Sequence, residues 1–232
     1  MSKKGLVKYI DEISEHPASD HIINAVKAIL STVPFGGGLA SLMSDYIPSS
    51  KHSRIINFTK QIAEDFKRLE DKIDELQMKT DEFAYILESC YKGVSENYQK
   101  IKIESFRGIL INSTLGHNAT TDEKEYFLGL VNSFSVLHIR ILLFMHTPKK
   151  YLDYYDIDEA LITGGFPNMF RVAIPDTNID VIKSAFGDLY QMGFLTTDKS
   201  IFSSMTASQG LSLLGNRVAD IGKRFIEFCS VE

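Results

Sequence analysis

Cysteine is scarce in this sequence: Cys90 and Cys229 are the only two among 232 residues, and they lie far apart along the chain. Neither has a histidine beside it or the sequence context of a catalytic nucleophile. The first residues, MSKKGLVKYIDEI, carry charges where a secretory signal peptide would need an apolar run. We therefore expect a cytoplasmic protein with free thiols, and we keep peripheral attachment to a membrane as an alternative.

An excess of positive charge is also missing. The chain has 25 lysines and arginines against 30 aspartates and glutamates, which gives a formal net charge of −5 at pH 7. Nucleic acids and anionic lipids attract proteins through positive charge, so binding to either would require a local basic patch. With 44% hydrophobic and 24% charged residues, the composition is that of a globular protein with one large or two small domains.

The motifs of nucleotide binding, metal binding and covalent catalysis are absent from the sequence. The run VPFGGGL, residues 33–39, is followed by Ala-Ser-Leu-Met and not by the lysine of a phosphate-binding loop. His138 and His146 are too far apart for a helical zinc pair, which needs a spacing of four. The acidic run 151–159 lacks the glycine and the distal glutamate of a calcium loop. We therefore expect no enzymatic activity, no cofactor and no metal site.

The glycine run has two structural interpretations. Between His21 and Asp45 the only charged residue is Lys27, so an apolar arm lies on each side of the glycines. The run is either a hinge between packed helices or the bend of a membrane-entering hairpin over residues 22–47. Each arm has only about half of the roughly 20 residues that a membrane-spanning helix needs. The residues of this hinge or membrane segment are Val33, Pro34, Phe35, Gly36, Gly37 and Gly38.

Apolar residues spaced alternately by four and three predict a long helix from Ser50 onward. This spacing is that of a coiled coil, and charged residues fill the positions between. A break near residues 79–81 separates this helix from a second one, which we expect to end at Leu115 because Gly116 suits a helix end. We expect the pair to take part in self-association. The interaction seam of the first helix is Ile55, Ile62, Phe66, Leu69, Ile73 and Leu76.

A further helix begins where Thr120 and Glu123 have the spacing of a capping box. We expect it to run as far as Met145, and its second half, residues 136–145, is apolar almost all round. That pattern is typical of the central buried helix of a bundle. Residues 148–158, rich in tyrosine and aspartate, predict a joint between a helical domain at 1–150 and a smaller domain at 151–232.

The last residues resemble the end of a winged-helix domain. The sequence RVADIGKRFIEFC, residues 217–229, reads as a short strand followed by an amphipathic helix, and residues 177–192 are similar to the second helix of that family. The resemblance implies that Phe194–Leu195 and Asn216–Val218 are wing strands. Together with VPFGGG, the long helical pair and GILINSTLG, this tail also resembles uncharacterised bacterial helical proteins. That second resemblance implies a fold and no particular activity.

A winged-helix domain can bind DNA, but the helix that would enter the groove is poor in basic residues. Lys183 is its only one, against Asp180 and Asp188, whereas phosphate binding needs clustered basic side chains. We therefore expect the tail to contact protein and not nucleic acid. Its expected contact surface is Phe186, Tyr190 and Phe194, exposed side chains that would pack on the helical bundle or on a partner.

The sequence thus predicts a mainly α protein, with a helical bundle of long coiled-coil-like helices followed by a small α+β winged-helix-like domain. The function that fits is a non-enzymatic protein-interaction or assembly protein, either a subunit of a bacterial cytoplasmic complex or a self-associating effector. Its expected partner is another protein or a second copy of the chain, with no small-molecule substrate indicated. Two alternatives stay open: a membrane-active, pore-forming or defence-type effector that uses residues 22–47, and a winged-helix DNA-binding regulator.

Overall fold

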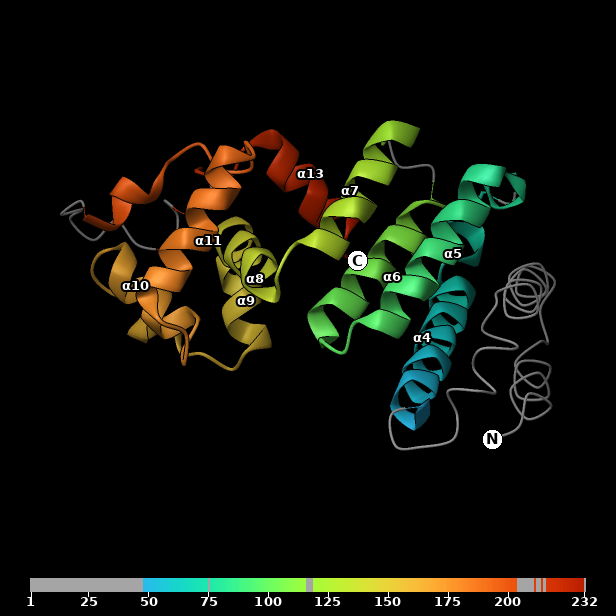
Figure 1. The fold of residues 1–232 in the computed structure, drawn as a ribbon, viewed down its shortest axis with the longest axis horizontal. Helices are drawn as coiled ribbons and strands as arrows, with labels where there is room; N and C mark the ends of the chain where they lie inside the picture. Colours follow the sequence, from blue (N-terminus) through green and yellow to red (C-terminus); the bar gives the residue numbers. More distant parts are fainter. Residues whose placement is uncertain are drawn as a thin grey trace. The chain divides into compact units, whose positions relative to one another are not determined.

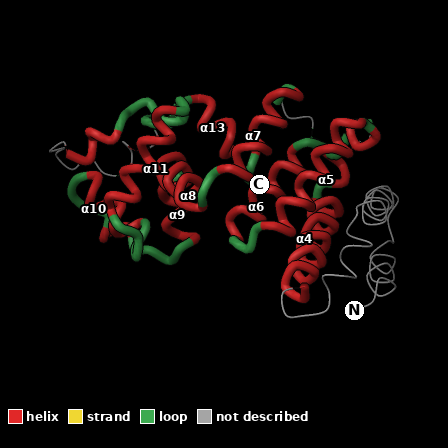
Figure 2. The backbone as a smooth tube through the Cα atoms, in the orientation of Figure 1, coloured by secondary structure: helices red, strands yellow, loops and turns green. Residues whose placement is uncertain are grey.

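The computed structural model describes residues 48–74, 76–115, 119–203, 211, 214 and 216–231 (Figure 1). Over these residues the protein is mainly helical, as the sequence predicts, and contains no strand (Figure 2). The chain divides into two compact units. Of the described residues, unit 1 contains those from 48 to 132 together with 228–231, and unit 2 contains those from 133 to 227.

Each α-helix in the described part of the chain keeps the label of Figure 1. The helices are α4 (Pro48–Arg68), α5 (Asp81–Glu96), α6 (Lys100–Asn112), α7 (Thr121–Ser133), α8 (Val136–His146), α9 (Pro148–Tyr154), α10 (Phe166–Ala173), α11 (Ile179–Gln191) and α13 (Asp220–Phe228). Short 3₁₀ helices lie at Glu70–Lys72, Gln77–Lys79, Glu159–Leu161 and Lys199–Ser203.

Helix α4 is shorter than the predicted interaction seam. It ends at Arg68, so Leu69, Ile73 and Leu76 of the predicted seam are not part of this helix. Ile62 and Phe66 are buried together with Phe58, and α4 packs against α5 and α6 of the same chain. Leu76, the last residue of the predicted seam, is 74% exposed. The prediction of one long coiled-coil helix is therefore wrong beyond Arg68.

An aspartate forms a turn in the segment that follows α4. The Oδ1 atom of Asp74 accepts the N–H of Leu76 at 2.9 Å, and the N–H of Asp74 donates to the carbonyl of Thr114 at 2.9 Å. An aspartate that bonds the backbone two residues further on favours a turn over a helix. The backbone that a longer helix would use is thus bonded to the turn after α6.

The second predicted long helix is two helices. Its start is confirmed, since Thr80 caps α5 by accepting the N–H of Phe83 at 3.2 Å. Helix α5 then ends at Glu96, where Asn97 donates its side-chain amide to the carbonyl of Gly93 at 2.9 Å. Short polar side chains that bond the nearby backbone compete with helix continuation, and α6 begins only at Lys100. The two helices pack against each other.

Helix α6 is the central helix of unit 1, and two glycines allow its close contacts. A Cβ atom on Gly93 of α5 would lie 2.3 Å from the ring of Phe106. A Cβ atom on Gly108 of α6 would lie 2.2 Å from the backbone of Cys229, near the end of the chain. Phe106 is fully buried, so its ring has little room to move.

The helix predicted from Thr120 to Met145 is also interrupted. Its capping box is confirmed: Thr120 donates its N–H to Glu123 Oε2 at 3.1 Å, and Glu123 donates its N–H to Thr120 Oγ1 at 3.3 Å. Helix α7 ends at Ser133, and Ser135 then begins α8 by donating its N–H to His138 Nδ1 at 3.2 Å. A second capping arrangement inside the apolar run therefore starts a new helix.

Helix α8 lies in the core of unit 2, as its all-round apolar sequence predicts. Five of its side chains are buried, namely Ile139, Ile141, Leu142, Phe144 and Met145. Phenylalanines surround it: Phe144 contacts Phe170 edge-on, with 5.3 Å between ring centroids, and Phe170 contacts Phe202 at 5.3 Å. The units divide at Asn132–Ser133, before the joint predicted at residues 148–158, where the structure has helix α9.

The segments predicted as wing strands meet in one antiparallel bridge between Leu195 and Val218. The N–H of Thr196 donates to the carbonyl of Arg217, and the N–H of Ala219 donates to the carbonyl of Phe194, each at 2.9 Å. No longer ladder exists among the described residues. The two segments thus pair where the expectation placed them, but the pairing is a single bridge and not a pair of strands.

We expect Gly93→Ala to lower the free energy of unfolding by roughly 1–3 kcal/mol, because the added methyl group overpacks against Phe106. Gly129→Ala is the matched control. Gly129 lies in α7 with nothing within 4 Å of its Cβ position, so alanine there should add up to about 1 kcal/mol through helix propensity. Urea denaturation monitored by circular dichroism measures both changes. Equal effects at the two glycines would contradict close packing at Gly93.

Candidate functional site

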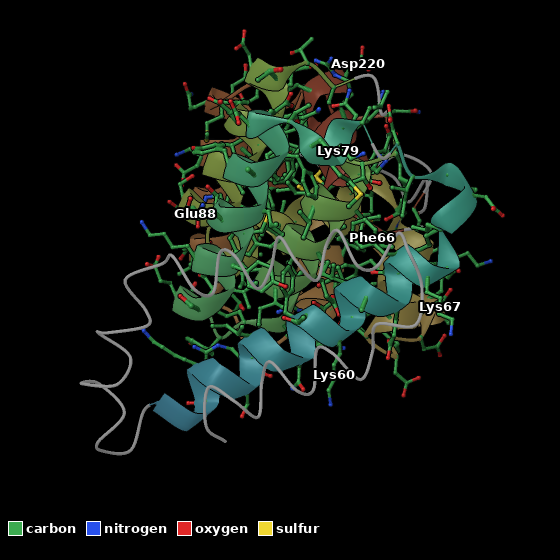
Figure 3. All side chains as sticks on the ribbon, turned by 90° about the vertical axis from the view of Figure 1, so that its right-hand side faces the viewer. Lys60, Phe66, Lys67, Lys79, Glu88 and Asp220 are labelled. Carbon is green, nitrogen blue, oxygen red and sulfur yellow. The ribbon has the colours of Figure 1, made fainter. Side chains whose placement is uncertain are left out.

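The predicted interaction seam does not form one surface. Ile62 and Phe66 point into the core of unit 1, whereas Lys60 and Lys67 project from α4 (Figure 3). Ile55, Leu69 and Ile73 are half-buried. Two seam residues, Ile62 and Phe66, are therefore part of the core of unit 1, whereas Leu76 is exposed.

The predicted hinge or membrane segment, Val33–Gly38 within residues 22–47, lies outside the described residues. Within the described residues, no single helix has both the length and the apolar composition to cross a membrane. Helices α7 and α8 meet those criteria only when they are taken together across the bend between them.

The expected tail contact surface is corrected at two of its three residues. Phe186 and Phe194 are fully buried inside unit 2, and only Tyr190 is exposed, at 38%. Phe186 packs edge-on against Phe202, and Phe194 packs edge-on against Phe225. The apolar spacing of Ile182, Phe186 and Leu189 along α11 is the sequence signal that marks Phe186 as core.

The exposed side of α11 carries acidic charge. Its only lysine, Lys183, lies with its Nζ atom 3.3 Å from Asp180 Oδ1. The Asp188 carboxylate is 3.4 Å from His138 Nε2, and its side chain is 62% exposed. The N–H of Ser135 donates to Nδ1 of His138, so the ring hydrogen lies on Nε2 and faces this carboxylate. The arrangement leaves the helix without the basic cluster that phosphate contacts require.

A buried ion pair joins α4 to α6 in unit 1. Both Asp65 carboxylate oxygens accept hydrogen bonds from Arg107, with 2.7 Å between Oδ1 and Nη2. Arg68 approaches the same Oδ1 at 3.3 Å, and the Asp65 side chain is 3% exposed. Hydrogen bonding to Asp65 raises the pKa of Arg107, against the opposing effect of its partial burial. This pair fixes the register of the two helices and leaves Asp65 enclosed by structural partners.

A second ion pair joins the first turns of α5 and α7. Lys124 Nζ lies 2.7 Å from Glu82 Oε1. The hydroxyl of Thr121 donates to the other carboxylate oxygen, Glu82 Oε2, at 3.2 Å. Because Lys124 is buried, the attraction between the charges holds the two helix starts together.

Arg140 organises a tyrosine cluster in unit 2. Its Nε atom donates to the hydroxyl of Tyr151 at 2.9 Å, and that hydroxyl donates to the carbonyl of Ala173 at 3.0 Å. The guanidinium carbon of Arg140 lies 4.8 Å from the ring centroid of Tyr155. Burial raises the pKa of Tyr151 to about 12, so the hydroxyl keeps the proton that it donates. The cluster fastens the end of α10 to α8 and α9.

The cysteines are not activated as nucleophiles. Burial raises the pKa of the Cys90 thiol and that of the Cys229 thiol, so both stay protonated at neutral pH. Among the described residues, no group of three or more histidine, cysteine, aspartate and glutamate side chains could hold a metal ion.

Three large side chains around α5 are exposed, and the sequence pattern did not single out one of them, Tyr85. Leu76 precedes the helix, Tyr85 lies on its outer side at 51% exposure, and Tyr98 follows its end at 75% exposure. We call these three residues the α5 surface. Exposed charged residues of α5 lie among them, namely Asp81, Glu88, Lys92 and Glu96 (Glu88 is labelled in Figure 3). The available signal was that Tyr85 falls outside the buried stripe of Phe83, Leu87 and Cys90.

We expect Arg107→Met to lower the free energy of unfolding by about 3 kcal/mol, because it leaves the buried Asp65 carboxylate without its main partner. Lys100→Met is the control, since the pair that it breaks with Glu104 is mostly exposed and should change stability by less than about 1 kcal/mol. The double variant Asp65→Leu with Arg107→Met should recover much of the loss. Chemical denaturation measures all three. Equal losses for Arg107→Met and Lys100→Met would contradict this role.

We expect no specific binding of duplex DNA through α11. At physiological salt, the affinity for random duplex should be weaker than about 1 µM, with a log–log salt slope near −1, since Lys183 offers one phosphate contact. A variant with Asp180→Lys and Asp188→Lys should bind more tightly and with a steeper slope, which checks the sensitivity of a fluorescence-anisotropy titration. Tighter binding by the wild-type chain with a slope steeper than about −4 would favour the DNA-regulator alternative.

Comparison with known proteins gave no matching family model, no matching curated protein and no matching solved structure.

Proposed function

We propose that this chain is a non-enzymatic assembly protein of the cytoplasm that associates with a second copy of itself through the α5 surface. The observation that carries the proposal is the exposure of Leu76, Tyr85 and Tyr98 before, along and after one helix. Tyrosine is enriched in protein interfaces because it offers a large apolar area with a hydroxyl that can bond a partner.

The surroundings of these side chains also support an interface. Apolar anchors bordered by charged groups are the usual anatomy of a protein contact. Around Tyr85, the exposed charges of Asp81, Glu88 and Lys92 have both signs, so two copies could pair opposite charges at the rim. Among the described residues, the buried stripe of α5 packs against α4 and α6, and Tyr85 lies outside that stripe with an exposed side chain.

This proposal replaces the seam as the site of self-association. A contact between copies through Ile62 and Phe66 would require unit 1 to open, since both side chains belong to its core. Contact through the α5 surface leaves that core intact. The change of site keeps the expected function of self-association.

We also propose that the end of unit 2 is a winged-helix-like module that serves protein contact. The bridge between Leu195 and Val218 supports it, because it pairs the two segments that correspond to wing strands. Helix α11 precedes this bridge and α13 follows it, as in the second and last helices of such a domain. The acidic side of α11 supports a protein partner over DNA.

The test is the concentration dependence of the molar mass by light scattering. We expect a wild-type dimer, and at least a tenfold increase in its dissociation constant (about 1.4 kcal/mol or more) for Tyr85→Lys with Tyr98→Lys, because interface tyrosines often dominate binding. Leu161→Lys is the control, since Leu161 is an equally exposed apolar residue of unit 2. A wild-type chain that stays monomeric, or a double variant that dimerises like the wild type, would rule out the α5 surface.

A further inference from the structure

The residues after Glu227 return to unit 1, where Asn112 of α6 binds them. Its side-chain amide donates one hydrogen bond to the carbonyl of Phe228 at 2.9 Å and another to the carbonyl of Ser230 at 2.8 Å. Asn112 and Phe228 are buried, so the bond between them is shielded from water, and the bond to Ser230 is partly shielded. An asparagine amide has two N–H donors, and here each one meets a main-chain carbonyl of the same short segment.

Two further residues shape the place where this segment lies. Gly108, one turn before Asn112 on α6, leaves room for the backbone of Cys229, which a Cβ atom would meet at 2.2 Å. Phe127 of α7 contacts the ring of Phe228, with 5.9 Å between the ring centroids. We call Gly108, Asn112 and Phe127 the acceptor site, and residues 228–230 the tail. The acceptor site therefore recognises an aromatic side chain and the non-helical backbone that follows it.

The helix that carries the tail is anchored elsewhere. Phe225 of α13 packs in unit 2 against Phe134 and Phe194, each at 5.7 Å between ring centroids. Gly222 permits close contact with the backbone of the same unit, since its Cβ atom would lie 2.6 Å from the carbonyl oxygen of Phe194. Residues 220–227 of α13 thus belong to unit 2, whereas Phe228 and the residues after it belong to unit 1.

We propose that the acceptor site is a peptide-binding site that takes the tail of a second copy of this chain. Exchange of an identical segment between copies creates no new type of contact, because every hydrogen bond and ring contact that holds the tail within one chain can form between two chains. Residues 220–227 of α13 stay in unit 2 during exchange, and only the tail leaves the acceptor site. The chain passes between the units for the first time at Asn132–Ser133, and helix α7 ends there at Ser133.

This inference deepens the proposed self-association by naming a second contact between copies, and it can be tested separately from the α5 surface. The tail within its own chain has a high effective concentration at the acceptor site, so exchange is visible only when the internal contact is blocked. Two full-length variants achieve this. Phe228→Asp disables the tail and keeps the acceptor site, whereas Gly108→Leu fills the acceptor site and keeps the tail. Both also carry Tyr85→Lys and Tyr98→Lys, which prevent association through the α5 surface.

We expect each variant alone to have the mass of one 26.1 kDa chain in light scattering, and an equimolar mixture to show a species of twice that mass. In the control mixture, Gly129→Leu replaces Gly108→Leu. Gly129 has open space around its Cβ position and its chain keeps an occupied acceptor site, so no pairing should occur. Circular dichroism checks that each variant is folded, and Asn112→Leu replaces Gly108→Leu if that chain is not.

A synthetic peptide of residues 224–231 provides the second measurement. It should bind the Phe228→Asp chain in calorimetry and show at least tenfold weaker binding to the Gly108→Leu chain. A mixture of folded variants that keeps the single-chain mass at every concentration would overturn exchange between copies. Failure of the peptide to bind the folded Phe228→Asp chain would overturn the acceptor site itself. Neither result would affect dimerisation of the wild type through the α5 surface.

Discussion

The close approach of backbone and side chains around α6 is the constraint on which unit 1 depends. Gly93 admits the ring of Phe106 on one side, and Gly108 admits the backbone of Cys229 on another. Each contact is closer than any side chain with a Cβ atom would allow. The close packing of unit 1 therefore depends on glycine at both positions. A well-packed interior has little free volume for the methyl group that alanine would add.

Polar groups inside this packing fix its register. Asp65 binds Arg107 across α4 and α6, Glu82 faces Lys124 across α5 and α7, and Asn112 binds the returning tail. Each pair meets across elements that apolar contacts alone could hold in several registers. A buried polar group without its partner costs free energy, so these pairs favour one arrangement over its neighbours. The surface that remains, with Tyr85 and Tyr98 exposed, is where our functional proposal lies.

Local signals in the sequence predicted several features well. The capping box at Thr120 and Glu123, the helix start at Thr80, and the buried character of residues 136–145 were all found as expected. Gly193, placed after a predicted helix, has a φ angle of 79°. These features depend on residues within one or two helical turns of each other. A sequence pattern can report such interactions because both partners lie in the same short stretch.

The candidate site was less predictable for the same physical reason. Phe186 and Phe194 were predicted to be exposed because the sequence does not show that Phe202 and Phe225, from other segments of the chain, pack on them. The heptad spacing continued past Arg68, but α4 ends there, and further along the predicted seam Asp74 is bonded to Thr114, a residue distant in sequence. The acceptor site for the tail left no sequence signal at all, since Asn112 and Ser230 meet only after the whole chain has folded.

By itself, the sequence determined the helical class, the helix starts and the residue types that fill the cores, because propensity, capping and apolar periodicity act locally. The tertiary structure decided where the long helices break, which apolar residues remain exposed, and where the last residues bind. Those outcomes depend on burial and hydrogen bonding between segments distant in sequence. Asn97 shows the difference, because asparagine can either continue a helix or end it. In the folded chain its side chain bonds the carbonyl of Gly93, the residue that packs closely on Phe106, and α5 ends there.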